Sequence, residues 1–182
     1  MTVAHYGTNN KPRVLWDIAL SEHHSILAVD VETHSVSDIT LLGIGISYNQ
    51  SSGFYITPDD PDFPVVVSIL RDQTVSKIYH NAPFDLRVLR EYKVDVDNVD
   101  DTALMARLLP EPSAVLENCS FWVGQQTESM RSLLEKHGVS KVIDLPFEVL
   151  AEKCCRDAMA TRALYDYYDA RIDMDYYRWL RP

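Results

Sequence analysis

Residues 25–33 read Ser-Ile-Leu-Ala-Val-Asp-Val-Glu-Thr, and this stretch decides the fold and the chemistry that we expect of the chain. A short apolar run of this kind predicts a strand over residues 25–31 that is buried on both faces. Two carboxylates, Asp30 and Glu32, stand one residue apart at its end, where a buried strand gains nothing from charge. Mg²⁺ and Mn²⁺ prefer oxygen ligands of this type. Two acids in this pattern also occur where a strand ends at a solvated turn. Motifs further along the chain must therefore decide between a metal site and a solvated strand end.

The size and composition of the chain predict one α/β domain. The chain has 182 residues, of which 46% are hydrophobic and 24% charged, as in ordinary globular proteins. We expect residues 1–12 to be a flexible N-terminus and residues 13–182 to form the domain. The longest apolar runs have the length of a strand, so we expect no membrane-spanning segment, and no secretory signal is seen.

Charge and cysteine content narrow the functional classes. The net charge of −10 argues against a general nucleic-acid coat, which needs a basic surface, but not against an enzyme that acts on the end of a strand. Cys119, Cys154 and Cys155 have no metal-ligand spacing. We therefore expect free thiols in a reducing compartment and a cytoplasmic location.

The pattern of apolar residues predicts an α/β layer followed by a helical second half. Strands are predicted over 25–31, 40–48, 53–57 and 77–80, and the polar turn at residues 49–52 predicts a hairpin. Helices are predicted over residues 14–21, 65–71, 83–92, 101–109, 128–137 and 146–168. The order of these elements predicts a mixed sheet with an antiparallel hairpin, flanked by helices.

Two further motifs place polar residues at the ends or on the faces of predicted elements. Asn81 follows a predicted strand, and Asp85 lies one helical turn after it. A simple helix cap would also explain that pair. On the last long helix, Asp157 shares a face with Thr161, and its small neighbours Ala158 and Ala160 allow close packing. Solvation at the edge of that face is the alternative for Asp157.

Together, these motifs resemble those of the DEDD 3′–5′ exonuclease superfamily. The surrounding residues are most similar to the proofreading domain of family A DNA polymerases of the bacterial polymerase I type. The similar segments are residues 28–33, 42–47, 81–85 and 101–102, and the resemblance spans residues 14 to about 170. It implies an RNase H-like (DnaQ-like) fold with the mixed sheet, hairpin and flanking helices described above.

The resemblance also implies a centre with two Mg²⁺ or Mn²⁺ ions. Carried over by position, Asp30 would bridge both ions, Glu32 and Asp157 would complete the first, and Asp85 would support the second. Two such ions can activate a water molecule and stabilise the leaving 3′ oxygen. Four converging carboxylates would repel one another without cations, so we expect at least one raised pKa in the metal-free protein.

Four residues near the motifs are candidates for holding the substrate. Thr33 and His34 are candidates for holding the terminal nucleotide through their backbone. Asn81 lies in the second motif, and Phe84 is a candidate for stacking on a base. Packing in the core is the alternative for Phe84.

The chain departs from the superfamily at one catalytic position. One branch of the superfamily has Tyr four residues before the last Asp, and the other has His five residues before it. This chain has Lys153 and Glu152 there. Lys153 could hydrogen-bond a metal-bound hydroxide, or act as a base if burial lowered its pKa. We therefore expect Lys153 to take part in catalysis, and we expect the loss of the usual tyrosine to reduce activity.

The leading functional hypothesis is a metal-dependent 3′–5′ exonuclease of the proofreading type. Its partner would be a single-stranded or frayed DNA 3′ end, with a polymerase domain in the same chain or in a separate one. A catalytically weakened fold that binds a single strand or a protein is the second hypothesis, and trimming of RNA 3′ ends in the manner of RNase D is the third. The sequence does not separate DNA from RNA, because that choice depends on contacts with the 2′-hydroxyl.

Overall fold

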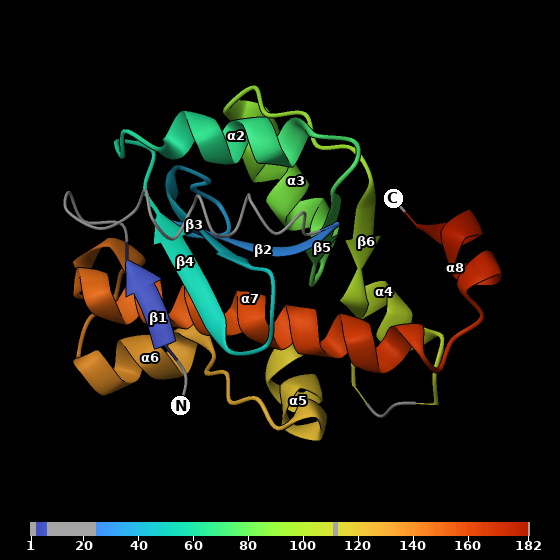
Figure 1. Ribbon diagram of the computed structural model, residues 1–182. Helices are drawn as coiled ribbons and strands as arrows, with labels where there is room; N and C mark the ends of the chain where they lie inside the picture. The colour runs from blue at the N-terminus through green and yellow to red at the C-terminus, as the bar shows by residue number, and fades with distance from the viewer. Residues whose placement is uncertain (1–2, 7–24, 111–112, 182) are drawn as a thin grey trace.

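A computed structural model describes residues 3–6, 25–110 and 113–181, which form a mixed sheet with helices on both faces (Figure 1). The strands follow the order β1-β4-β3-β2-β5-β6. Their bounds are β1 Val3–Tyr6, β2 Ile26–Thr33, β3 Leu41–Ser47, β4 Ser52–Ile56, β5 Ser76–Tyr79 and β6 Val99–Asp101. The helices are α2 Phe63–Arg71, α3 Ala82–Glu91, α4 Thr102–Arg107, α5 Leu116–Ser120, α6 Met130–His137, α7 Phe147–Asp169 and α8 Met174–Leu180, with 3₁₀ turns η1 Phe121–Val123 and η2 Val142–Asp144.

Strand β2 lies inside the sheet and carries the acidic motif at its carboxyl end. It pairs antiparallel with β3 along most of its length, from Ala28 opposite Ser47 to Thr33 opposite Leu41. It pairs parallel with β5 only as far as Ala28. The end of β2 therefore extends past β5, and its backbone there can donate a hydrogen bond to the helix that follows β5.

The hairpin predicted after the first strand is confirmed, because β3 and β4 pair antiparallel. The carboxamide oxygen of Asn49 closes the turn by accepting hydrogen bonds from the backbone amides of Ser51 and Ser52, each at 2.8 Å. Asn is common in turns for this reason.

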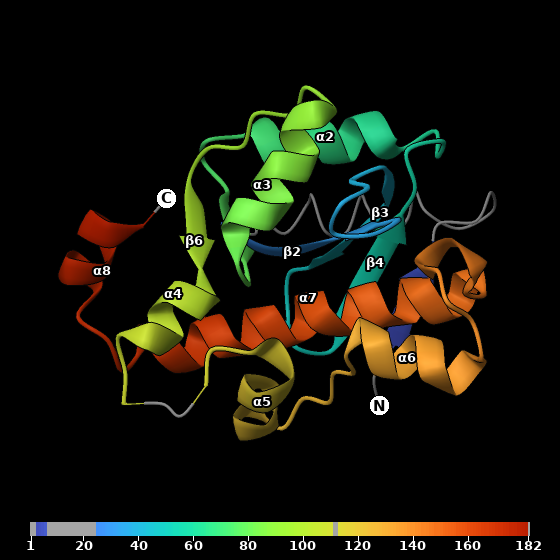
Figure 2. The same ribbon diagram turned by 180° about the vertical axis from the view of Figure 1, so that it is seen from behind.

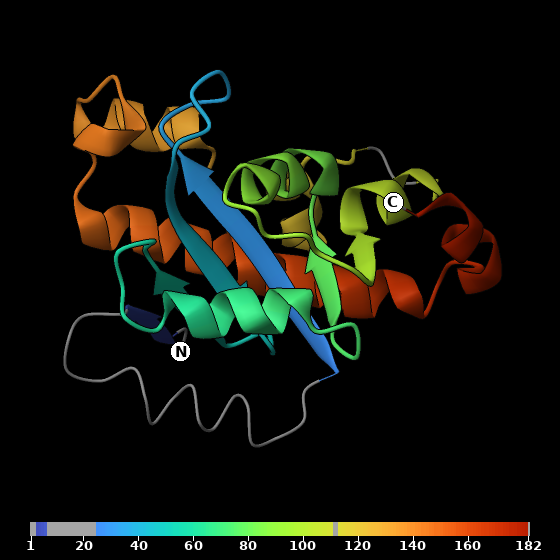
Figure 3. The same cartoon turned by 90° about the horizontal axis from the view of Figure 1, so that it is seen from above.

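The two faces of the sheet are covered by different helices. Side chains alternate across a strand, so Val29 and Val31 point to one face and Asp30 to the other. The two valines lie in a buried cluster with Val66 of α2 and Leu89 of α3. Helix α7 lies across the opposite face, and Figures 2 and 3 show α2 and α3 on one side of the sheet and α7 on the other.

Helix α7 approaches the hairpin unusually closely, because glycines face it. A Cβ atom on Gly45 would lie 2.7 Å from both the carbonyl oxygen and the Sγ atom of Cys154, and one on Gly53 would lie 2.8 Å from the Cβ atom of Cys155. The facing residues of α7 are small and fully buried: Ala151, Cys154, Cys155 and Ala158. The length of α7 is close to the prediction, and its small residues pack as expected.

Asp101 joins two helix N-termini to the sheet. The prediction placed it at the start of a helix, whereas it ends β6 and caps α4. Its carboxylate accepts hydrogen bonds from the amides of Asn81 and Ala82 at 2.9 and 3.1 Å, and from Ala103 at 2.9 Å. Asn81 has a left-handed backbone with φ of 75° and makes no side-chain cap bond, so Asp101 provides the cap that the sequence suggested for Asn81.

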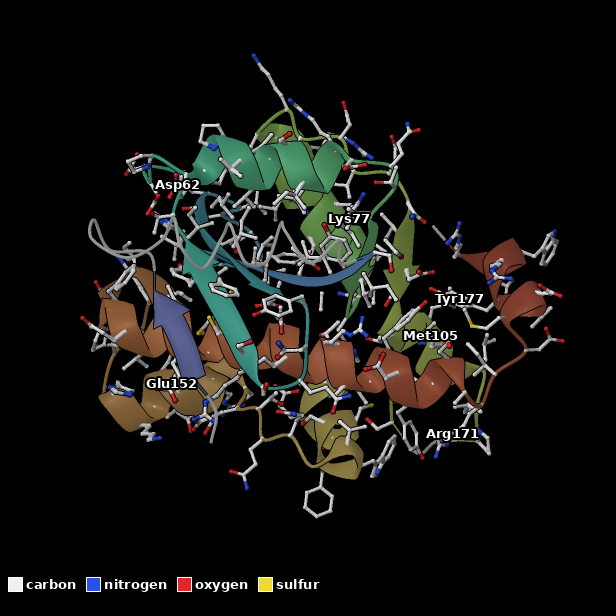
Figure 4. The ribbon with its side chains drawn as sticks, viewed as in Figure 1. Asp62, Lys77, Met105, Glu152, Arg171 and Tyr177 are labelled. Atoms are coloured by element: carbon white, nitrogen blue, oxygen red, sulfur yellow. The ribbon has the colours of Figure 1, made fainter. Side chains whose placement is uncertain are left out.

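Both ends of the chain differ from the sequence prediction where they are described. Residues 3–6 lie in the segment expected to be flexible, yet they form β1, because the outer edge of β4 offers them a parallel backbone partner. The helix predicted over residues 14–21 lies outside the described residues. The C-terminal tail forms α8, and its Tyr177 lies in a buried cluster with Met105 of α4 (Figure 4).

Among the described residues, no helix has the length and apolar character needed to cross a bilayer.

Replacing Gly45 with Ala tests the close packing of α7. We expect the free energy of unfolding to fall by about 1–3 kcal/mol, because the added methyl group overlaps α7. Adding Cys154→Ala to Gly45→Ala should not restore the lost stability, because the backbone carbonyl oxygen of Cys154 stays 2.7 Å from the added Cβ atom. Urea unfolding of both variants measures the effect, and wild-type stability of Gly45→Ala would contradict the packing described here.

Replacing Asp101 with Ala tests the shared cap. We expect a loss of roughly 2–4 kcal/mol, because several backbone amides at two helix starts lose their acceptor. Asp95 is exposed, so Asp95→Ala is the matched control and should stay within about 0.5 kcal/mol of wild type. Equal urea midpoints for the two variants would show that Asp101 does not carry the cap.

Candidate active site

Asp30 and Glu32 start the site on the α7 side of β2. Residues two apart on a strand share a face, and one carboxylate oxygen from each lies within 4.8 Å of the other and of the Sγ atom of Cys154. Glu32 is buried. The Oδ2 atom of Asp30 is also buried, and it has no hydrogen-bond partner among the described residues.

Helix α7 supplies the opposite wall through Lys153 and Asp157. These residues are four apart and therefore share one face of the helix. The Nζ atom of Lys153 lies 2.7 Å from Oδ2 of Asp157 and 2.8 Å from Oε1 of Glu32. The other oxygen of Asp157, Oδ1, is buried with no hydrogen-bond partner in the described part of the chain.

Asp85 reaches the site from the first turn of α3. Its Oδ1 atom accepts a hydrogen bond from the backbone amide of Val31 at 3.1 Å. That amide is within reach because β2 extends past the end of β5 at this point. The structure therefore brings Asp30, Glu32, Asp85 and Asp157 into one region from three elements. Their assignment as metal ligands remains a prediction.

Loss of hydration is the main electrostatic effect at these acids. Burial raises the pKa of Asp30 and of Asp85 well above the usual range, and it raises the pKa of Asp157 to about 6. The positive charge of Lys153 lowers the pKa of Asp30 and of Asp157, and nearby carboxylates raise both pKa values further. The sequence argument attributed a raised pKa to mutual repulsion, whereas burial contributes more, because α7 covers this face of the sheet.

Lys153 keeps its charge in this setting. Burial alone would lower the pKa of its ammonium group. The charges of Asp157, Glu32 and Asp30 act in the other direction and together hold the pKa well above its ordinary value. The hypothesis that burial makes Lys153 a base is therefore not supported by its surroundings, and a positively charged lysine fits the site.

The chemistry of the donors fits a hard divalent cation. Asp30 and Asp157 each have a buried carboxylate oxygen that no group in the described part of the chain contacts by a hydrogen bond, and such oxygens are the ligands that this kind of ion prefers. Cys154 is a poor ligand here, because burial holds the pKa of its thiol well above the usual range. Its Sγ atom instead lies 3.5 Å from the backbone carbonyl oxygen of Asp30.

The predicted substrate residues lie in different environments. Thr33 is buried, and its hydroxyl donates to the carbonyl of Ser35 at 3.0 Å. The ring of His34 lies 3.2 Å from a carboxylate oxygen of Asp38. Asn81 is exposed, and Phe84 packs against the core cluster, as the alternative for this residue predicts. Their roles in binding stay predictions.

A cleft of about 600 Å³ adjoins the α7 side of the site, and sequence reasoning missed most of it. Lys153 and Asp157 line it together with Arg156, Phe121 and Lys136. Figure 4 labels Glu152, another lining residue, toward the α6 end of α7. Phe121 is 80% exposed, which is unusual for an aromatic side chain. The only signal in the sequence was a polar and aromatic segment between two predicted helices.

Solved structures that share this fold include nucleases and a polymerase domain. Brucella melitensis NrnC superposes with a TM-score of 0.74 at 19% identity, covering 99% of this chain and 86% of that chain. The RNase D of Trypanosoma brucei gives 0.67 at 17% identity, covering 96% and 69%. The POL domain of Pol1 from M. smegmatis gives 0.55 at 20% identity, covering 93% and 28%. These similarities show the fold, and the predicted RNase H-like exonuclease fold is confirmed.

Sequence comparison gives the family directly. No curated protein matches the chain. A family model described as 3′-5′ exonuclease matches residues 16–172, which is most of the chain and includes the four acids. The DEDD-type resemblance stated from the motifs is confirmed by this match. The chain belongs to the 3′–5′ exonuclease family.

Proposed function

We propose that this chain removes nucleotides from the 3′ end of a single strand by metal-dependent hydrolysis of phosphodiester bonds. The observation that carries the proposal is a pair of buried carboxylate oxygens, Oδ2 of Asp30 on β2 and Oδ1 of Asp157 on α7, neither of which has a hydrogen-bond partner among the described residues. Asp157 also lines the cleft. Enzymes of this family use divalent metal ions, and NrnC has been determined with bound Mg²⁺. Asp30, Glu32, Asp85 and Asp157 would hold two such ions here.

The chain's own groups divide the remaining work. Bound ions would supply an activated water and charge stabilisation at the phosphate. Asp85 anchors the end of β2 through Val31 and so fixes the direction of the acidic strand. The exposed ring of Phe121 offers a face on which a base can stack. Arg156 and Lys136 line the same cleft, where each is paired with an acid, Glu152 and Glu128.

A short region of contact suits the charge of this protein. A net charge of −10 leaves few surfaces able to bind many phosphates. The basic residues that line the cleft are Arg156, Lys136 and Lys153, and each is paired with an acid, so the cleft suits only a few nucleotides at a strand end. This supports an enzyme that acts on 3′ ends rather than one that coats long strands.

DNA is the substrate suggested by the resemblance to proofreading domains, and RNA is the second candidate. Similarity to RNase D favours RNA, and NrnC has also been determined bound to pGG. A fold that binds a single strand or a protein without cutting is a third candidate, because Lys153 stands where one branch of the superfamily has its catalytic tyrosine.

Replacing Asp30 with Asn tests the metal site. We expect the cleavage rate to fall at least about 100-fold, because an oxygen ligand loses its charge. The metal-free melting temperature should stay equal or rise, since a buried charge is removed. A 5′-labelled strand with Mn²⁺, with and without chelator, gives the rate. Asp95→Asn is the control at an exposed site, and full activity of Asp30→Asn would exclude Asp30 from the metal centre.

The choice between DNA and RNA is tested with strands of identical sequence. We expect shortening from the 3′ end, seen as a ladder of 5′-labelled products, and slower shortening when the 3′ end carries a phosphate. Initial rates on DNA and RNA at equal concentration decide the substrate. Cleavage of RNA alone would remove the proofreading proposal. Binding of both strands with no cleavage in Mn²⁺ or Mg²⁺ would favour the binding module.

A further inference from the structure

The ammonium group of Lys153 occupies the space between two of the proposed metal ligands. It hydrogen-bonds both Glu32 and Asp157, at 2.8 and 2.7 Å. The side chains of the three residues are 13%, 8% and 9% exposed, so water does little to screen these charges. One positive charge therefore lies directly between two negative charges that a divalent ion would need.

The other cations of α7 are arranged differently. Arg156 pairs with Glu152, and Arg162 pairs with Asp166, each with an acid four residues away on the same helix. Lys153 also has its partner Asp157 four residues away, but it reaches across to Glu32 on β2 as well. The lysine therefore links the helix to the sheet at the acids, whereas the two arginines pair along the helix.

We propose that Lys153 is a tethered counter-ion that competes with a divalent cation for Glu32 and Asp157. Its ammonium group neutralises these acids while no metal is bound and must move aside when an ion binds them. The inference rests on the proposed assignment of Glu32 and Asp157 as metal ligands. It gives two of the four acids in this region a counter-charge in the absence of metal.

Two consequences follow from this arrangement. Loss of the lysine charge removes the competitor, so the affinity for a divalent ion should rise. It also leaves Glu32 and Asp157 without a counter-charge, so the metal-free protein should lose stability, as happens when one partner of a buried ion pair is removed. A lysine that only filled space, or that only contacted the substrate, would produce neither effect.

The test compares Lys153→Met with the parent protein in buffer freed of metal by chelation and dialysis. Met keeps a long unbranched side chain and removes the charge. Lys141 is exposed, so Lys141→Met is the matched control for the same substitution on the surface. Calorimetric titration with Mn²⁺ gives the affinity, and thermal unfolding with and without Mn²⁺ gives the stability.

We expect Lys153→Met to bind Mn²⁺ at least about tenfold more tightly than the parent. Its metal-free melting temperature should be lower than that of the parent, and the increase on adding Mn²⁺ should be larger. Lys141→Met should match the parent in both measurements. A Lys153→Met protein that is unfolded without metal but folds on addition of Mn²⁺ also supports the proposal.

Unchanged or weaker Mn²⁺ binding by Lys153→Met overturns the proposal, as does a variant that stays unfolded at saturating Mn²⁺. Neither measurement uses a substrate, so the result is independent of the nuclease assay. Tighter binding by Lys153→Met with no cleavage by any variant would keep this inference and remove the proposed activity. If the parent cleaves the strand but Lys153→Met binds Mn²⁺ no more tightly than the parent, the proposed activity stands and this inference falls.

Discussion

The close contact of α7 with the β2–β3–β4 face is the interaction on which the site depends. Gly45 and Gly53 leave no side chain between the hairpin and the helix, so Cys154 and Cys155 lie against the strand backbone. This contact brings Lys153 within hydrogen-bond distance of Glu32, although the two residues are 121 positions apart in sequence. A wider spacing would separate the acids of α7 from those of β2, so the packing of the core and the geometry of the site are a single requirement.

That contact also creates the electrostatic problem of the molecule. Covering the face of β2 removes water from Asp30 and Asp157, and burial raises the pKa of both. The charge of Lys153 offsets part of this cost in the metal-free protein, and divalent ions would offset it in the loaded enzyme. Buried acids without enough partners reduce stability, which is a common property of sites that bind ions or do chemistry.

The sequence predicted most of the elements around the site, but it could not assign partners. The strand ending at Asp30, the hairpin at Asn49 and the long helix with Asp157 follow from local patterns of apolar and turn residues. The role of Asp101 does not, because a carboxylate that caps two helices looks like any acid before a helix. The short strands β1 and β6 were also missed, since a strand of three or four residues has too little pattern of its own and exists through its neighbour.

By itself, the sequence determined the family and the longer elements around the site, and it proposed the four acids, because these depend on residue types at short spacings. It also showed that Lys153 stands where a tyrosine or histidine is expected. Only the tertiary structure decided what that lysine contacts, because its two partners lie on different elements and meet through the packing of α7. The same holds for the oxygens of Asp30 and Asp157 that have no hydrogen-bond partner among the residues the structure describes, since burial and missing partners are properties of the assembled core and not of any segment.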